Sequence, residues 1–115
     1  MATISNLVID QGTTFSSIIT LTDQTGSALN LTGYTAKSQF RKSYQSSTAT
    51  NFTVSIYDAL AGKVRLQLSP TASSAVRAGR YIYDIELTSP ASAVIRALEG
   101  LVIITPEITK IWQIL

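Results

Sequence analysis

The amino-acid sequence predicts an all-β fold, an antiparallel β-sandwich or small barrel of seven or eight short strands with one helical turn. Three observations lead to this prediction. Apolar and polar residues alternate with a period of two along most of the chain, which is typical of strands with one buried face. Residues that favour turns separate the alternating stretches. No helical period of roughly 10–15 residues lies between them, so repeated strand–helix–strand units are not expected.

The composition indicates one soluble domain with a sizeable core. The chain has 115 residues, of which 45% are hydrophobic and 14% are charged, and its net charge is +2. The few basic residues are scattered, so we expect no nucleic-acid partner. The sequence contains no Cys and no His, which excludes disulfides, thiolate metal sites and His-based catalytic triads. We find no signal-peptide pattern and no apolar stretch that approaches the ~18–20 residues of a membrane span, so we expect no membrane association.

Three alternating stretches in the first half of the chain predict strands at residues 4–10, 13–23 and 34–41. In the second stretch the expected inward face carries Phe15, Ser17, Ile19 and Leu21. In the third it carries Tyr34, Ala36, Ser38 and Phe40. A turn over residues 23–26 and a polar loop over residues 45–51 are expected to follow the second and third strands.

The second half of the chain predicts a hairpin and two longer strands. Residues 52–57 and 64–68 alternate cleanly on either side of a turn and form the expected hairpin. Residues 80–89 predict the next strand. Residues 94–106 predict a long final strand that is bent or bulged at Gly100 and ends at its proline.

The stretch between residues 70 and 78 departs from the strand pattern and predicts one or two helical turns. Ser69 suits the N-cap position, and Pro70 suits the first helical position because proline lacks an N–H that would be unpaired there. Gly79 suits the C′ position that follows a helix.

Two carboxylates within residues 80–89 raise the question of an acid–base or metal site. Asp84 and Glu86 stand two residues apart, so on a strand they share a face and lie about 7 Å apart. We expect that face to be the outer one, because the alternate positions carry Tyr81, Tyr83, Ile85 and Leu87. Cross-strand ion pairs are then expected with Arg96, Arg65 or Arg80. An outer strand face rarely supplies the burial that tunes a catalytic carboxylate.

The other candidate catalytic, metal-binding or phosphate-binding residues are no stronger. Asp10, Asp23 and Asp58 adjoin turns, where aspartate commonly binds nearby backbone. Residues 23–27 lack the spaced acidic ligands of a calcium loop, and every glycine is isolated, so no phosphate-binding loop is present. The spacing of the serines and lysines in the sequence does not exclude a catalytic Ser–Lys pair. We therefore expect no enzyme, no catalytic residue, no cofactor and no metal site.

Three stretches together resemble small virion structural proteins of tailed, cyanophage-like bacteriophages. They are "IDQGTTFSSIITLTDQTGSALNLTGYTAKSQFRKS", "GKVRLQLSPTASSAVRAGRYIYDIELTSP" and "VIRALEGLVIITPEIT". The same layout resembles the N-terminal domain of phage baseplate upper proteins, and it covers residues 4–109. The resemblance implies an Ig-like β-sandwich that joins one virion component to another without catalysis.

The function expected from this resemblance is that of a virion structural protein, a tail or baseplate adaptor or attachment subunit. It would be assembled in the host cytoplasm, in multiple copies of a symmetric assembly, and would dock onto larger virion proteins. One alternative is a capsid decoration protein. A further alternative is a carbohydrate-binding adhesion module, for which the exposed aromatic candidates are Tyr44, Tyr57 and Trp112.

The last nine residues differ from the rest of the chain. We expect a β-sandwich domain over residues 1–106 and an apolar C-terminal tail over residues 107–115. Large apolar side chains left in water favour aggregation, so they are expected to be covered. The expected partner-binding residues are Ile108, Ile111, Trp112, Ile114 and Leu115. The alternative is that the tail folds back onto its own domain.

Overall fold

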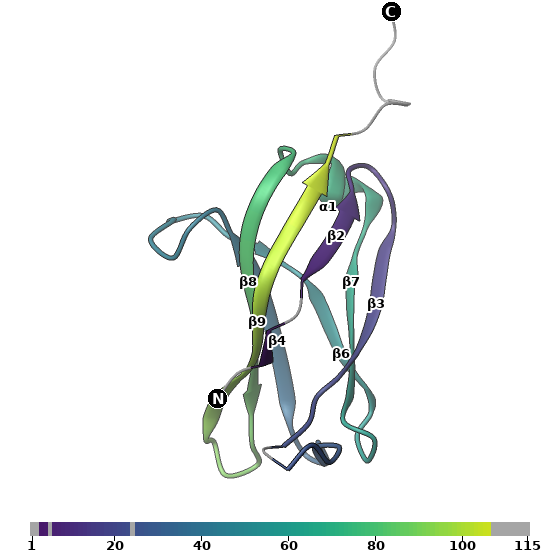
Figure 1. Ribbon diagram of the computed structural model, residues 1–115, viewed down its shortest axis with the longest axis vertical. Helices are drawn as coiled ribbons and strands as arrows, with labels where there is room; N and C mark the ends of the chain where they lie inside the picture. Colours follow the sequence, from purple (N-terminus) through teal and green to yellow (C-terminus); the bar gives the residue numbers. More distant parts are fainter. Residues whose placement is uncertain (1–2, 5, 24, 107–115) are drawn as a thin grey trace, which may run out of the picture.

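Two β-sheets and one short helix make up the protein over residues 3–4, 6–23 and 25–106, which the computed structural model describes (Figure 1). The larger sheet contains β1 (Thr3–Ile4), β2 (Leu7–Asp10), β4 (Thr35–Arg41), β5 (Thr50–Asn51), β8 (Gly79–Thr88) and β9 (Val94–Thr105). The smaller sheet contains β3 (Phe15–Thr20), β6 (Thr53–Asp58) and β7 (Lys63–Leu68). The prediction of an all-β sandwich with one short helical segment is confirmed.

The alternation of the sequence accounts for the core, because every second residue of a strand points to the same side of its sheet. The inward faces predicted for the strands are the buried ones, and Tyr83 of β8 is only 4% exposed. Phe52 lies between β5 and β6, where the chain passes from one sheet to the other. Its ring centroid lies 5.1 Å from that of Phe40 and 6.2 Å from that of Tyr83, so the two sheets share an aromatic cluster.

The strand order is that of an immunoglobulin-like sandwich. The smaller sheet runs β3-β7-β6 and the larger sheet runs β9-β8-β4-β5, which corresponds to the B-E-D and G-F-C-C′ order of such domains. The expected strand at 4–10 is divided into β1 and β2, and both pair parallel to β9. Between them the Asn6 carboxamide oxygen accepts a hydrogen bond of 3.0 Å from the Leu101 N–H. Alternation alone could not predict this parallel edge, because it carries no information on strand direction.

The helical segment α1 (Pro70–Ser74) is shorter than predicted. The Ser69 hydroxyl caps its first turn, and proline occupies the first helical position, as expected. The prediction that Gly79 is the C′ residue is wrong, because Ala75 is the C-cap and Gly79 begins β8. The chain leaves the helix early because the Val76 side chain turns into the core. Within the described residues, no helix is long and apolar enough to cross a membrane.

A hydrogen bond fixes the corner between the helix and β8. The Tyr81 hydroxyl donates to the carbonyl oxygen of Arg77 over 2.6 Å. A tyrosine near the start of this strand, bonded to the backbone a few residues upstream, is a hallmark of immunoglobulin-like domains. This tyrosine corner therefore supports the immunoglobulin-like sandwich that the strand order indicates.

The bulge in the long final strand lies at Ala97, and the prediction that placed it at Gly100 is wrong. Ile85 pairs with Leu98 and Glu86 pairs with Arg96, so Ala97 is the extra residue of β9. Gly100 stays in register opposite Tyr83, on the inward face of the sheet.

Candidate functional site

The residues predicted to bind a partner lie outside the described part of the chain. They are Ile108, Ile111, Trp112, Ile114 and Leu115. Their proposed role therefore stays a prediction from the sequence.

The two carboxylates of β8 face outward, as the alternation predicted. The Asp84 carboxylate accepts a hydrogen bond of 3.2 Å from Arg96 Nε, and Arg96 Nη1 lies 3.6 Å from Glu99 Oε2. Of the arginines expected to pair with Asp84, Arg96 is therefore the one that does. Arg65 belongs to β7 of the other sheet and lies over the Tyr57 ring at 4.7 Å from its centroid. Asp84, Arg96 and Glu99 thus form a surface ion-pair cluster.

The bulge of β9 creates this cluster. Counted in steps of two from the buried Leu98, Arg96 would point into the core. The extra residue at Ala97 reverses the alternation and puts Arg96 opposite the outward-facing Glu86. Arg96 can therefore reach both Asp84 and Glu99 on the outer face.

Four planar polar side chains form one row across the outer face of the larger sheet. Asn51 of β5 pairs in register with Gln39 of β4, Gln39 pairs with Asp84, and Asp84 pairs with Glu99. Residues directly opposite each other lie on the same face of a sheet, at the inter-strand spacing of about 4.8 Å. The row therefore carries two carboxamides and two carboxylates over a length of about 14 Å.

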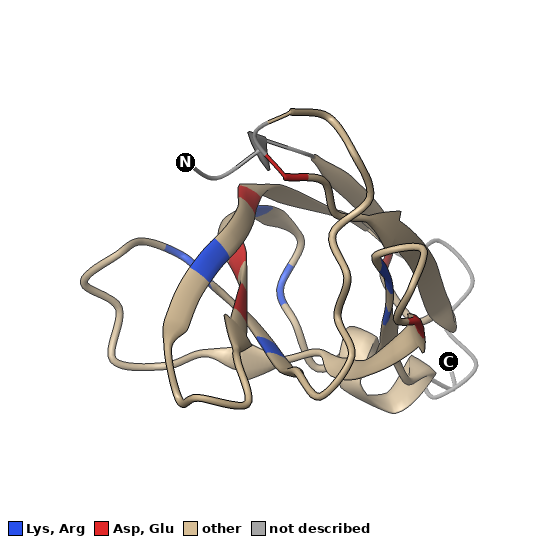
Figure 2. Ribbon diagram, turned by 90° about the horizontal axis from the view of Figure 1, so that it is seen from below, with Lys and Arg blue, Asp and Glu red and all other residues tan. Residues whose placement is uncertain are grey.

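This row lies in an open groove of about 840 Å³. On one side of the row the registers place Lys37, Glu86 and Arg96, and on the other side they place Arg41, Ile82 and Leu101. Six charged side chains line the groove, three basic and three acidic, so their formal charges cancel. Basic and acidic positions are also interspersed over the rest of the fold (Figure 2).

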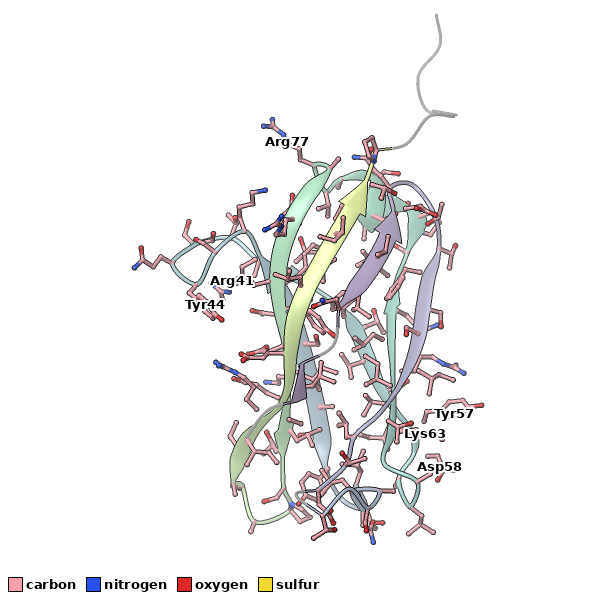
Figure 3. The ribbon with its side chains drawn as sticks, in the orientation of Figure 1. Arg41, Tyr44, Tyr57, Asp58, Lys63 and Arg77 are labelled. Carbon is pink, nitrogen blue, oxygen red and sulfur yellow. The ribbon has the colours of Figure 1, made fainter. Side chains whose placement is uncertain are left out.

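One exposed aromatic ring borders the groove. Tyr44 is 75% exposed and lies in the loop between β4 and β5, which projects from the sandwich beside Arg41 (Figure 3). The Arg41 guanidinium donates to the Ser46 carbonyl oxygen over 2.7 Å and to Gln39 Oε1 over 3.2 Å. The Ser43 N–H donates to the Ser46 hydroxyl over 3.0 Å. Arg41 thus ties the loop that carries the ring to the row of polar side chains.

Tyr44 and Tyr57, two of the three aromatic residues suggested for a carbohydrate site, do not lie together. Tyr57 is 52% exposed on β6 of the smaller sheet, far from Tyr44 in Figure 3. Trp112 lies outside the described residues. Of the two tyrosines, Tyr44 borders the groove and Tyr57 does not.

Asp23 and Asp58 bind nearby backbone groups, as expected, whereas the Asp10 carboxylate accepts a hydrogen bond of 2.7 Å from the Thr105 hydroxyl. The Asp23 carboxylate accepts hydrogen bonds from the hydroxyl and N–H of Thr25 and from the N–H of Ser27. The Thr25 hydroxyl in particular, with these backbone bonds, holds the pKa of Asp23 below its ordinary value. Asp58 accepts from the Ala61 N–H. Within the described residues, no group of three or more acidic side chains is placed to hold a metal ion.

The buried serine of α1 is bound to backbone groups. The Ser73 hydroxyl lies 2.9 Å from the Thr13 carbonyl oxygen and accepts a hydrogen bond of 3.0 Å from the Gly12 N–H. These contacts join the helix to the turn that precedes β3. The burial and the bonds of Ser73 are accounted for by this structural role.

The sequence analysis did not single out Gln39, Asn51 or Glu99. Each stands at an outward position of a strand, which the alternation does indicate. Their assembly into one row depends on the registers of β5 with β4, of β4 with β8 and of β8 with β9. Of these registers, that of β8 with β9 contains the bulge, which carries no clear signal in the sequence.

The chain was compared with known proteins. No family model matches it, and no curated protein matches it. Among solved structures it is similar to the internalin-like protein lmo2027 of Listeria monocytogenes, with a TM-score of 0.45 and 10% sequence identity. The match covers 92% of this chain and 28% of that chain, so this chain spans less than a third of that protein. A similarity of this degree carries no argument about function.

Proposed function

We propose that the chain is a non-enzymatic structural protein of a bacteriophage virion, a tail or baseplate adaptor or attachment subunit that docks onto larger virion proteins. The three stretches that resemble such proteins in sequence contain β3, β4, β7, β8 and β9, which are five of the nine strands that the structure describes. The Asp84 carboxylate faces outward in an ion pair with Arg96, and the buried Ser73 hydroxyl is bound to backbone groups. These observations favour a contact protein over an enzyme.

The observation that carries the proposal is the edge of the larger sheet at β2. This short strand pairs with β9, and its Val8 is 63% exposed opposite Ile103. An exposed apolar side chain on an edge strand suits the addition of a strand from another protein. β9 ends at Thr105 opposite Asp10 of β2, and the sequence continues after it with the apolar residues 107–115. The β2 edge and the tail can therefore contribute to the same contact with another virion protein.

The proposal is tested on purified particles of the phage that encodes the chain. We expect mass spectrometry of the virions to detect the chain, and gold-labelled antibodies against it to bind the tail or baseplate. Labelling of the head would instead support the alternative of a capsid decoration protein. A chain that is made during infection but absent from purified virions would contradict both assignments.

A further inference from the structure

The groove on the larger sheet combines two features that suit the recognition of a sugar. A pyranose ring presents hydroxyl groups around its edge and an apolar C–H surface on its face. The hydroxyls both donate and accept hydrogen bonds, and carboxylates and carboxamides are planar groups that can bind pairs of them. Asn51, Gln39, Asp84 and Glu99 supply four such groups in one row. The Tyr44 ring beside them supplies a flat apolar surface.

The loop that carries Tyr44 is tied to the polar row by Arg41. Arg41 donates both to the backbone of the Tyr44 loop, at Ser46, and to the side chain of Gln39. The exposed ring and the polar row are therefore linked through one guanidinium. Ordering of a binding site before the ligand arrives lowers the entropy cost of binding.

The charges of the groove indicate a ligand without net charge. Its three basic and three acidic side chains cancel, and Arg96 is already shared between Asp84 and Glu99. A polyanion would approach three carboxylates, and a polycation would approach three basic groups. A neutral oligosaccharide binds through hydroxyl groups and is repelled by neither set of charges.

An extended peptide fits this surface less well. Peptides that bind sheets in extended form usually add to a free strand edge through their backbone. At the polar row, β4 is paired on both sides, with β5 through Gln39 and with β8 through the same residue. Among the described strands, only the two-residue β5 leaves a strand edge free beside the row, so most of the groups offered to a ligand there are side chains.

We propose that the groove formed by Asn51, Gln39, Asp84, Glu99 and Tyr44 binds a neutral oligosaccharide. The ring of Tyr44 stacks on a sugar face, and the row of carboxamides and carboxylates binds its hydroxyls. The length of the row, about 14 Å, suits a short run of sugar units. This site is distinct from the β2 edge and does not depend on the virion assignment.

The test uses the full chain on an array of immobilised neutral, amino and anionic oligosaccharides, followed by calorimetric titration of the neutral sugars that bind. We expect binding of at least one neutral oligosaccharide, with an affinity that changes little between low and high NaCl concentrations. Tyr44→Ala is expected to weaken that affinity by about tenfold or more, and Gln39→Ala to weaken it as well. Nuclear magnetic resonance shifts on titration are expected at the groove.

Tyr57→Ala is the matched control, because it removes another exposed tyrosine from the opposite sheet. We expect this variant to bind the sugar as the unaltered chain does, and circular dichroism to show both tyrosine variants folded. The proposal is overturned if no neutral oligosaccharide binds, or if the two tyrosine variants lose affinity equally. Binding only to anionic sugars, with a strong salt dependence, would also overturn it, as would Tyr44-dependent binding of peptides alone.

Discussion

Arg96 Nε lies 3.2 Å from Asp84 Oδ2 on the outer face of the larger sheet. The pair is partly exposed, with the side chain of Arg96 49% and that of Asp84 29% accessible to solvent. Ion pairs in such surroundings contribute less than about 1 kcal/mol, because water screens the charges and the side chains lose freedom. The pair therefore belongs to the surface of the sandwich, and its contribution to folding is small.

We expect the combined change Asp84→Asn and Glu86→Gln to leave the fold nearly as stable as before. Both side chains face outward, so the free energy of unfolding should change by less than about 1 kcal/mol. Unfolding in urea, followed by circular dichroism, measures this change. A loss of several kcal/mol would mean that the carboxylates have a structural role that their exposure does not indicate.

Tyr83→Ala tests the opposite face of the same strand. Tyr83 is 4% exposed and packs near Phe52, so its truncation leaves a cavity in the core. We expect the free energy of unfolding to fall by about 3 kcal/mol or more. Equal losses in this variant and in the Asp84 and Glu86 variant would show that the two faces of β8 have been assigned the wrong way round.

Gly62→Ala is expected to destabilise the turn between β6 and β7 strongly. Gly62 has a φ of +69°, and a Cβ added there would lie 2.5 Å from the Leu21 carbonyl oxygen and 2.8 Å from that of Leu29. Backbone strain and the clash together should cost about 3 kcal/mol. Thermal and urea unfolding give the measurement.

Gly26→Ala is the control for that change. Gly26 also has a positive φ, of +87°, but an added Cβ would meet no atom within 4 Å. Only the backbone strain applies, so we expect a loss of about 1 kcal/mol. If the two alanine variants were equally stable, close packing around Gly62 would not be the reason for the glycine there.

The turn at Asp23 should show a measurable pH dependence. The hydrogen bond from the Thr25 hydroxyl, with the backbone bonds beside it, lowers the pKa of Asp23 in the folded chain. Because the folded pKa is the lower one, the stabilisation is present above the unfolded pKa and is lost as the pH falls through the folded pKa. We expect Thr25→Val to raise the pKa of Asp23, as followed by nuclear magnetic resonance titration. An unchanged pKa in that variant would contradict the role given to the hydroxyl.

Deletion of residues 110–115 tests the role predicted for the tail. The described core already includes Val102 and Ile104, which are buried between the sheets. We therefore expect the shortened chain to stay folded, with a melting temperature within a few degrees of the original, but to be lost from virions. If the shortened chain unfolds, the tail is part of its own domain. If it folds and is incorporated normally, the tail is not the docking segment.

Much of the fold could be predicted because one signal, the period-two alternation, decides which residues are buried. The inward faces of β3, β4 and β8 follow directly from it, and so does the outward position of Asp84. Capping chemistry likewise identified Ser69 as the start of the helix. These features are local, so neighbouring residues in the sequence carry the information.

The features that the sequence did not predict are those that depend on pairing between strands distant in the sequence. The parallel pairing of β2 with β9, the bulge at Ala97 and the early end of α1 each depend on tertiary contacts. The bulge matters most for the candidate site, because it brings Arg96 to the outer face. The row that includes Gln39 and Glu99 could not be recognised before the strand registers were known.

A cryo-electron microscopy reconstruction of the virion tests the central claim most directly. Residues 6–23 and 25–106 provide a sandwich that can be fitted into the density of the particle. We expect repeated copies on the tail or baseplate, with the β2 edge around Val8 covered by a neighbouring protein. A virion without this sandwich, or one in which the β2 edge and residues 107–115 contact no other protein, would contradict the account.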